Sequence, residues 1–342
     1  MVTALVNGRV LLDEGFVDDR VVLLEAGRIV DIVAVGDAHR RGAERHDLKG
    51  HLLLPGFLDT QVNGGGGVLF NAEPTIEAID AKVPGVLGIH IEGPFLNVVR
   101  KGVHDPAKIR GLDEGAIGLL TSLANGRTLV TLAPEMTTPD IIARLTSAGV
   151  VVSAGHTNAT YEQIRTALEH GLTGFTHLFN AMSQLTGRAP GVVGAALEDT
   201  KSWCGIIVDG YHVDPAVLRI ALRCRPHDRF MLVTDAMPSV GATEKSFSLQ
   251  GRTISRERGV LVDENGTLAG TDVDMAQTVR NAIDLLGLDL PTAVRMASRY
   301  PAEFLGLGSE LGRIASGYRA NLVLLDAGFS VVESWIDGET AP

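Results

Sequence analysis

The sequence predicts an α/β fold: a TIM-like (β/α) barrel joined to a small β domain. Two observations predict it. Apolar runs recur along the 342-residue chain, and each ends at a polar side chain. Amphipathic stretches separate the runs, which favours parallel strands whose carboxyl ends share one rim, where barrel enzymes hold their chemistry. The strand-end residues are Gln61, Glu92, Glu135, His156, His177, His212 and Asp235.

The pattern is clearest between residues 150 and 183. The apolar run Val150–Gly155 stops at His156, and residues 160–170 have helical spacing. The next short strand, 174–176, stops at His177. One strand-helix-strand unit therefore places two imidazoles at neighbouring strand ends. The alternative is a pair of unrelated structural histidines.

Both chain ends are rich in short strand patterns. Neither end has enough apolar residues for a core of its own, so we expect residues 1–50 and 312–342 to pair into one small β-sandwich domain. Strands are predicted at 4–12, 21–25 and 28–33, with a tight turn at Ala26-Gly27, and at 312–314, 321–326 and 331–336.

Residues 51–311 are expected to form the catalytic barrel. A β insertion is predicted at 243–270, around the Asn265-Gly266 turn. Further strands are predicted at 52–58, 86–91, 129–132, 205–208 and 230–234, and helices from Thr138-Pro139 to Ala148, from Asp214-Pro215 onwards, and from Asp274 to Leu286.

Composition narrows the functional classes. The chain is 45% hydrophobic and 5% aromatic with 40 glycines, which suits an α/β protein. Its net charge of -11 argues against a nucleic-acid partner. Cys204 and Cys224 cannot build a disulfide framework, and neither a signal peptide nor an 18-residue apolar run is found. We therefore expect a cytoplasmic protein with no membrane partner.

Two imidazoles and one carboxylate are a ligand set that suits zinc. We expect Glu92, His156 and His177 to bind one divalent metal per chain, with zinc favoured and iron, cobalt or manganese as alternatives. Asp235, at a later strand end, is the candidate base for a metal-activated water. The alternative for Asp235 is a helix-capping or ion-pairing role.

Three further side chains suit an anionic sugar substrate. His104 and His212 can donate hydrogen bonds to an oxyanion or a sugar oxygen. Arg188 lies in a loop shortly after His177 and can clamp a phosphate with two hydrogen bonds. A solvated surface arginine is the alternative for Arg188.

Six ordered motifs resemble the N-acetylglucosamine-6-phosphate deacetylase family of the amidohydrolase superfamily. They span nearly the whole chain, and the ordered set is highly specific. The motifs are Leu-Pro-Gly-Phe-Leu-Asp at 54–59, His-Ile-Glu-Gly-Pro-Phe at 90–95, Ala-Gly-His-Thr-Asn-Ala at 154–159, Thr-His-Leu-Phe-Asn-Ala-Met at 176–182, Asp-Gly-Tyr-His at 209–212 and Val-Thr-Asp-Ala at 233–236.

This resemblance implies a homodimer that hydrolyses N-acetylglucosamine 6-phosphate to glucosamine 6-phosphate and acetate, in amino-sugar catabolism and cell-wall recycling. It implies that Asp235 is the acid/base and that His104 contacts the acetyl carbonyl. The metal ligands it implies are Glu92, His156 and His177, and the sugar-phosphate contacts are Asn180, Ala181, Arg188 and His212 with the backbone of Leu268, Ala269, Gly270 and Thr271.

The chain departs from the resemblance in two places. Many amidohydrolases have His-x-His after the first barrel strand, whereas this chain has Gln61-Val62-Asn63. An amide is a poor ligand, so we expect Gln61 to be the remnant of a second metal site. Residues 68–85 are also shorter than usual; they suffice for one helix, at 74–82, but not for two β/α units. We therefore expect an irregular or open barrel wall between Gln61 and Glu92.

Two other functions are compatible with these residues. One is another N-acyl or cyclic-amide hydrolase of the same superfamily, which would not need a phosphate clamp at Arg188. The other is an inactive sugar-phosphate binder, which would hold the sugar phosphate without releasing acetate.

Overall fold

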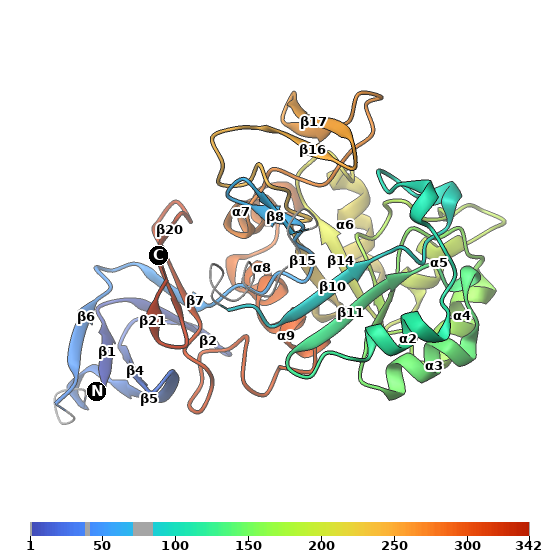
Figure 1. Cartoon of the computed structure of the whole chain (residues 1–342). Helices are drawn as coiled ribbons and strands as arrows, with labels where there is room; N and C mark the ends of the chain where they lie inside the picture. Colours follow the sequence, from blue (N-terminus) through green and yellow to red (C-terminus); the bar gives the residue numbers. More distant parts are fainter. Residues whose placement is uncertain (1, 38–41, 71–84, 342) are drawn as a thin grey trace. The chain divides into compact units, whose positions relative to one another are not determined.

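The computed structural model describes residues 2–37, 42–70 and 85–341 (Figure 1). The chain forms two compact units: residues 1–59, 75–86 and 275–342 belong to the first, and residues 60–74 and 87–274 to the second. The predicted fold class, a TIM-like barrel with a small β domain, is confirmed. None of the helices in the described ranges has the length and apolar character needed to cross a bilayer.

The first unit contains one β-sheet built from the N-terminal end of the chain and one built from both ends. One has the strand order β5-β4-β1-β6, and the other has the order β21-β20-β19-β7-β2-β3. The strands of the first sheet are β1 (Thr3–Val6), β4 (Arg20–Glu25), β5 (Arg28–Ala34) and β6 (Glu44–Asp47). Those of the second are β2 (Arg9–Leu12), β3 (Gly15–Val17), β7 (Leu52–Pro55), β19 (Leu322–Leu325), β20 (Val331–Ile336) and β21 (Glu339–Thr340).

The two sheets share one apolar core. Leu5 and Leu24 contribute from the first sheet, and Leu53, Leu322 and Trp335 contribute from the second; all five are buried in one cluster. Side chains from two facing sheets that fill a common core make a β-sandwich. The predicted pairing of the two chain ends is therefore confirmed.

Three strand predictions for this unit need correction. The segment predicted as one strand from 4 to 12 is two strands, because Asn7 (φ 58°) turns the chain and Gly8 packs where a Cβ would lie 2.6 Å from Leu48 Cδ1. Residues 312–314 form no strand. The strand at Leu52–Pro55 pairs with β19 and β2 in the sandwich, not with barrel strands.

Among its described residues, the first unit also holds three α-helices, α7 (Met275–Leu286), α8 (Leu290–Ala297) and α9 (Arg299–Phe304). The helix predicted from Asp274 to Leu286 is α7. The domain division predicted from sequence, with boundaries after residues 50 and 311, stays a prediction.

The second unit contains the barrel sheet. Its six strands are all parallel and follow sequence order, β10-β11-β12-β13-β14-β15. Consecutive strand order is typical of a barrel, whereas in a doubly wound sheet the order of the strands reverses near the middle of the sheet. The strands are β10 (Gly88–Glu92), β11 (Arg127–Leu132), β12 (Val151–Ala154), β13 (Gly174–Phe175), β14 (Trp203–Ile207) and β15 (Phe230–Val233).

A helix follows each of the first five strands (Figure 1). The predicted caps are present: the hydroxyl of Thr138 accepts from the Ile141 amide, and Asp214 accepts from the Ala216 amide. Thr160 begins a helix with a capping box. These helices are α2 (Glu114–Leu120), α3 (Pro139–Ser147), α4 (Tyr161–Glu169), α5 (Gly191–Glu198) and α6 (Pro215–Cys224).

The barrel wall differs on the two sides of Gln61. Residues 61–63 bond to the segment after β15, through Asp235 N to Gln61 O (2.9 Å) and Asn63 N to Ala236 O (2.8 Å). On the other side, β10 pairs only with β11 among the described strands, so the sheet has an edge where an irregular wall was predicted. The helix predicted at 74–82 lies outside the described residues.

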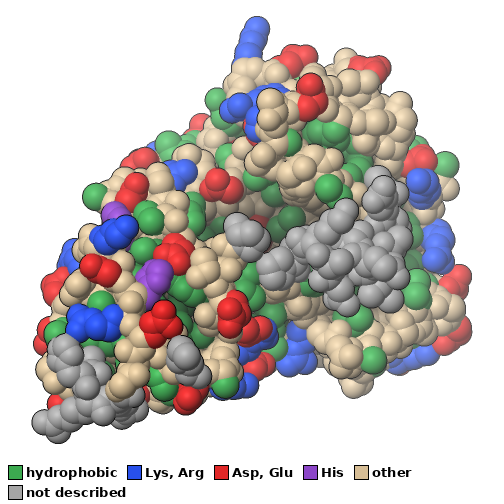
Figure 2. All heavy atoms as spheres, turned by 60° about the vertical axis from the view of Figure 1, so that its left-hand side comes forward, with side chains coloured by type: hydrophobic (Ala, Val, Ile, Leu, Met, Phe, Trp, Pro, Cys, Tyr) green, Lys and Arg blue, Asp and Glu red, His purple; other side chains and the backbone are tan. Residues whose placement is uncertain are grey.

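The predicted β insertion is present as the antiparallel sheet β16 (Ser246–Leu249), β17 (Arg252–Glu257) and β18 (Val260–Val262). Leu249, Ile254 and Leu261 form its small core with Met237 and Ala269. On the face of the molecule shown in Figure 2, Lys and Arg side chains are interspersed with Asp and Glu, so that face carries charge of both signs.

Candidate active site

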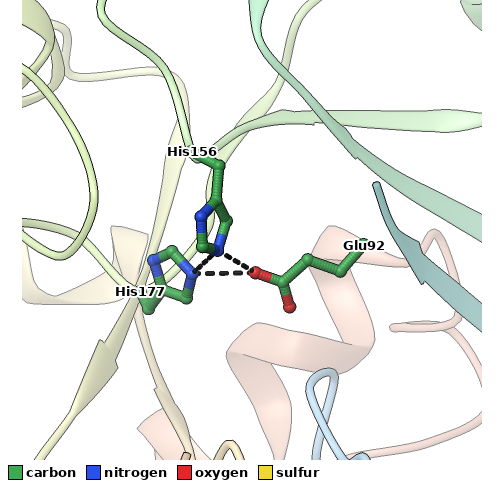
Figure 3. A group of neighbouring side chains, drawn as sticks. All are labelled: Glu92, His156 and His177. Carbon is green, nitrogen blue, oxygen red and sulfur yellow. Dashed lines mark hydrogen bonds and ion pairs between the residues drawn. The ribbon is translucent and has the colours of Figure 1, made fainter. Parts of the chain in front are cut away.

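Three side chains converge at the carboxyl ends of β10, β12 and β13. Glu92 Oε1 lies 2.9 Å from His156 Nε2 and 2.8 Å from His177 Nε2, and the two Nε2 atoms are 3.1 Å apart. Figure 3 shows the two rings and the carboxylate pointing at one another. Both histidines are buried. The structure therefore brings the three predicted ligands together.

The donor set fits a divalent metal ion. Metal–ligand bonds of about 2.0–2.2 Å in a tetrahedral site place ligand atoms about 3.3–3.6 Å apart, somewhat wider than the separations of 2.8, 2.9 and 3.1 Å between these three atoms. The Nδ1–H of His156 donates to the Arg100 carbonyl at 2.7 Å, so its Nε2 keeps the lone pair that a metal needs. The group is a metal-binding candidate within the described chain.

The backbone at the site is strained. His156 (φ 48°), His177 (φ 34°) and Asp235 (φ 51°) all occupy the left-handed region without being glycine. Such conformations cost on the order of 1–3 kcal/mol each and persist only where neighbouring structure fixes them. Each tight turn directs a side chain towards the rim as soon as its strand ends.

Gln61 contacts the triad of Glu92, His156 and His177 through Glu92. Its Nε2 donates to Glu92 Oε2 at 3.0 Å, which leaves Oε1 facing the two histidines. Burial opposes ionisation of Glu92, but the charges and hydrogen bonds of His177 and His156 outweigh it and hold the pKa of Glu92 well below its usual range. Glu92 is therefore an anionic ligand with one oxygen already engaged.

Asp235 is held by a residue that sequence reasoning left without a role. Asn63 Nδ2 donates to Asp235 Oδ1 at 2.7 Å. Burial and the negative charge of Glu92 raise the pKa of Asp235 above its ordinary value. A carboxylate with a raised pKa and a fixed orientation suits proton transfer.

The segment 268–271 lies against the backbone of Asp235. Thr271 N donates to Asp235 O at 2.9 Å. A Cβ on Gly270 (φ 67°) would lie 2.7 Å from the same carbonyl and 2.5 Å from Met237 Cγ, so only glycine fits there. The predicted substrate-binding backbone is thus adjacent to the predicted acid/base.

His104 lies next to the triad. Its ring packs edge-on against His156, with the centroids 4.7 Å apart. Burial lowers the pKa of His104 to about 4, and repulsion by His156 adds to the effect. His104 is therefore a neutral imidazole at neutral pH, with one N–H available to donate.

His212 is oriented by Asp209. Its Nδ1–H donates to Asp209 Oδ2 at 2.6 Å, and both side chains are almost fully buried. Burial alone would raise the pKa of Asp209, but its hydrogen bond from His212 lowers it. The pair leaves His212 Nε2 as the atom available to a ligand.

The remaining predicted contacts lie on the segment after His177. Asn180 is half-buried, and its backbone N–H donates to the His177 carbonyl at 2.9 Å; Ala181 (φ 50°) follows it in the same turn. Arg188 lies in the exposed loop before α5, and no described residue pairs with its guanidinium. The structure thus places Asn180 and Ala181 in the turn directly after His177 and leaves Arg188 exposed; their contacts with a substrate stay a prediction.

A buried layer of hydroxyls lies below the triad. His90 Nε2 contacts Thr131 Oγ1 at 2.7 Å, Thr131 contacts Thr176 at 2.6 Å, and Thr176 donates to Ser153 at 2.8 Å. These residues come from four neighbouring strand ends. The sequence did not predict this layer, because isolated threonines and serines form no recognisable pattern. It also did not predict the contacts of Glu135, whose position at a strand end was the only signal.

Comparison with known proteins assigns the family. The family model described as "Amidohydrolase family" matches residues 71–341. The chain belongs to the amidohydrolase family. Members of this family depend on metal, which agrees with the metal-binding geometry of Glu92, His156 and His177.

Several amidohydrolases are similar over most of the chain. The N-acetylgalactosamine-6-phosphate deacetylase of Shewanella sp. is 42% identical over 84% of this chain and 82% of its own. The N-acetylglucosamine-6-phosphate deacetylase of Haemophilus influenzae is 32% identical over 98% of each. The crystal structure of N-acetylglucosamine-6-phosphate deacetylase from Pasteurella multocida is 33% identical, has a TM-score of 0.94 and is covered fully in both directions.

We expect the purified protein to retain one equivalent of divalent metal after extensive dialysis, because Gln61 offers an amide N–H where many amidohydrolases have a histidine. Inductively coupled plasma mass spectrometry measures the metal content per chain. Two tightly bound equivalents would contradict this prediction.

Proposed function

We propose that this amidohydrolase removes the acetyl group from N-acetyl-D-glucosamine 6-phosphate, giving D-glucosamine 6-phosphate and acetate. The observation that carries the proposal is the convergence of Glu92, His156 and His177 beside Asp235 and His104. The relatives named for this reaction, which cover nearly all of the chain, support it.

The chemistry follows from the groups at the rim. A divalent ion held by Glu92, His156 and His177 would supply Lewis acidity, which makes water nucleophilic at neutral pH and polarises an amide carbonyl. Asp235 takes the proton of the attacking water and then gives it to the leaving amine. The neutral His104 donates a hydrogen bond to the acetyl oxygen as negative charge develops there.

Sugar-phosphate binding is assigned to the surrounding segments. His212, held by Asp209 through Nδ1, contacts the substrate through Nε2, and Asn180, Ala181 and residues 268–271 contribute polar groups. Arg188 completes the phosphate contact. Its exposure is compatible with this role, because the guanidinium has no competing partner among the described residues.

We further propose zinc as the metal, the cytoplasm as the location and a homodimer as the assembly. The two-nitrogen, one-oxygen donor set supports zinc. Both cysteines are free thiols, which fits a reducing compartment. Light scattering of the metal-loaded protein tests the dimer.

A second substrate is favoured by one observation: the Shewanella relative, at 42% identity, is named for N-acetylgalactosamine 6-phosphate. The two sugars differ only in the configuration at C4. Initial rates of acetate release from both 6-phosphates, compared as kcat/KM, decide which one the enzyme prefers. A preference for the galactosamine compound would move the assignment to that epimer and leave the chemistry unchanged.

We expect the phosphate to be essential for productive binding. Loss of a charge-assisted contact costs roughly 1.5–3 kcal/mol, so kcat/KM for free N-acetylglucosamine should fall by at least about one to two decades. Arg188→Ala should approach the same defect on the phosphorylated sugar, while Arg223→Ala, which removes an exposed arginine on α6, should not. Equal kcat/KM for the free and phosphorylated sugars would remove Arg188 from the site.

A further inference from the structure

Glu135 accepts three hydrogen bonds at the rim and has no assigned role. It follows β11, in the 3-10 turn Pro134–Met136. Its Oε1 accepts from Asn97 Nδ2 at 2.9 Å and from the Asn158 amide at 2.6 Å, and its Oε2 accepts from Thr157 Oγ1 at 2.5 Å. One carboxylate therefore ties together two segments, 97–100 and 157–158.

Both segments hold His156. Residues 157 and 158 follow it directly, and the Asn97 amide donates to the His156 carbonyl at 2.9 Å. Asn97 also accepts from the Val99 amide and so begins the short helix Val98–Arg100. At the end of that helix, the Arg100 carbonyl accepts from His156 Nδ1 at 2.7 Å. The backbone and the ring of His156 are thus each fixed by a segment that Glu135 anchors.

This anchoring matters because His156 occupies a strained conformation. With φ at 48°, the residue would relax towards an ordinary region if its neighbours moved. A relaxed backbone would swing Nε2 away from Glu92 Oε1 and His177 Nε2, which now lie within 3.1 Å of it. Glu135 does not itself contact the imidazole; it acts through the two segments.

We propose that Glu135 is a positioning residue that holds His156 in metal-binding geometry and so sets the affinity of the triad for its ion. This inference rests on the proposed metal site and adds a residue to it. Outer partners of metal ligands typically contribute about 10- to 100-fold in metal affinity. We therefore expect Glu135→Ala to raise the metal Kd by about that factor.

The test measures metal binding directly. Stripped protein is titrated with Co²⁺ against a chromophoric chelator, and the visible spectrum of the bound ion is recorded. Glu135→Ala should weaken binding and alter the spectrum. Glu135→Gln keeps an amide oxygen for Asn97 and Asn158, so it should restore most of the affinity and the wild-type spectrum.

Asp199→Ala is the matched control. Asp199, like Glu135, accepts three hydrogen bonds, here from the Lys201 and Ser202 amides and from Arg165 Nη1. It lies before β14, at the opposite end of the strand from the rim. Its loss should lower stability and leave the Co²⁺ Kd unchanged. If Glu135→Ala does not fold, Thr157→Val is the second variant. It removes one of the three bonds to Glu135, together with the bond that the hydroxyl accepts from the Ala159 amide, and should weaken binding by up to about tenfold.

A Co²⁺ Kd and spectrum for the folded Glu135 or Thr157 variant that match the wild type would overturn the positioning role. The wild type compared with His156→Ala separates this outcome from failure of the metal site itself. If those two proteins bind Co²⁺ equally weakly, the triad is not the metal site and both proposals fall.

Discussion

Asp235→Asn is expected to keep its metal and to lose about 10² to 10⁴ in kcat, because an amide cannot take the proton of water and pass it to the leaving amine. Asparagine is nearly isosteric, and Asn63 can still contact the remaining carbonyl oxygen. Metal content per chain and steady-state acetate release measure the two effects separately.

The pH profile adds an independent readout. Burial and Glu92 raise the pKa of Asp235, and the base must be deprotonated to act. The wild-type kcat should therefore fall as the pH drops through that pKa, and Asp235→Asn should lack this limb. Asp113→Asn changes an exposed helix N-cap in the same way and should leave kcat unchanged. Near-normal turnover by Asp235→Asn would exclude Asp235 as the acid/base.

His177→Ala is expected to lose both the metal and the activity. Its Nε2 lies within 3.1 Å of both other donor atoms, so its removal opens one of three protein positions to water and weakens chelation. The metal content of the purified variant and its rate with added Zn²⁺ are the measurements. His156→Ala should behave alike.

His170→Ala serves as the control for histidine truncation, because His170 is exposed at the end of α4 and its ring hydrogen-bonds to the Thr166 carbonyl, away from the rim. It should retain its metal and its activity. A His177→Ala protein with a full equivalent of metal would show that the ion is bound elsewhere.

Periodicity and capping residues were sufficient to predict most of the fold. The parallel strands β11 to β15 are largely buried apolar runs, whereas β10 is half-buried. Thr138, Thr160 and Asp214 begin their helices as predicted. Residues 52–55 were misplaced because a buried strand has the same apolar pattern in a sandwich as in a barrel. Only their pairing with β19 and β2 distinguishes them, and pairing between distant segments is not encoded locally.

The same distinction between local patterns and distant contacts applies to the residues of the site. Strand-end histidines and carboxylates stand out in a sequence, so the triad and Asp235 were predictable. The residues that orient them were not, because their partners are distant: Asn63 holds Asp235, and Glu135 holds the turn after His156. Gln61 was predicted as a remnant of a second metal site, and its donation to Glu92 Oε2 became visible only in three dimensions.

The most direct test of amide hydrolysis at a single-metal site is a metal titration of the stripped enzyme, followed by acetate release from N-acetylglucosamine 6-phosphate. The rate should rise linearly with added Zn²⁺ and stop rising at one equivalent per chain. A rate that keeps rising to two equivalents would contradict the single-metal site. A fully loaded protein that binds the sugar phosphate without releasing acetate would contradict the hydrolase and identify an inactive binder.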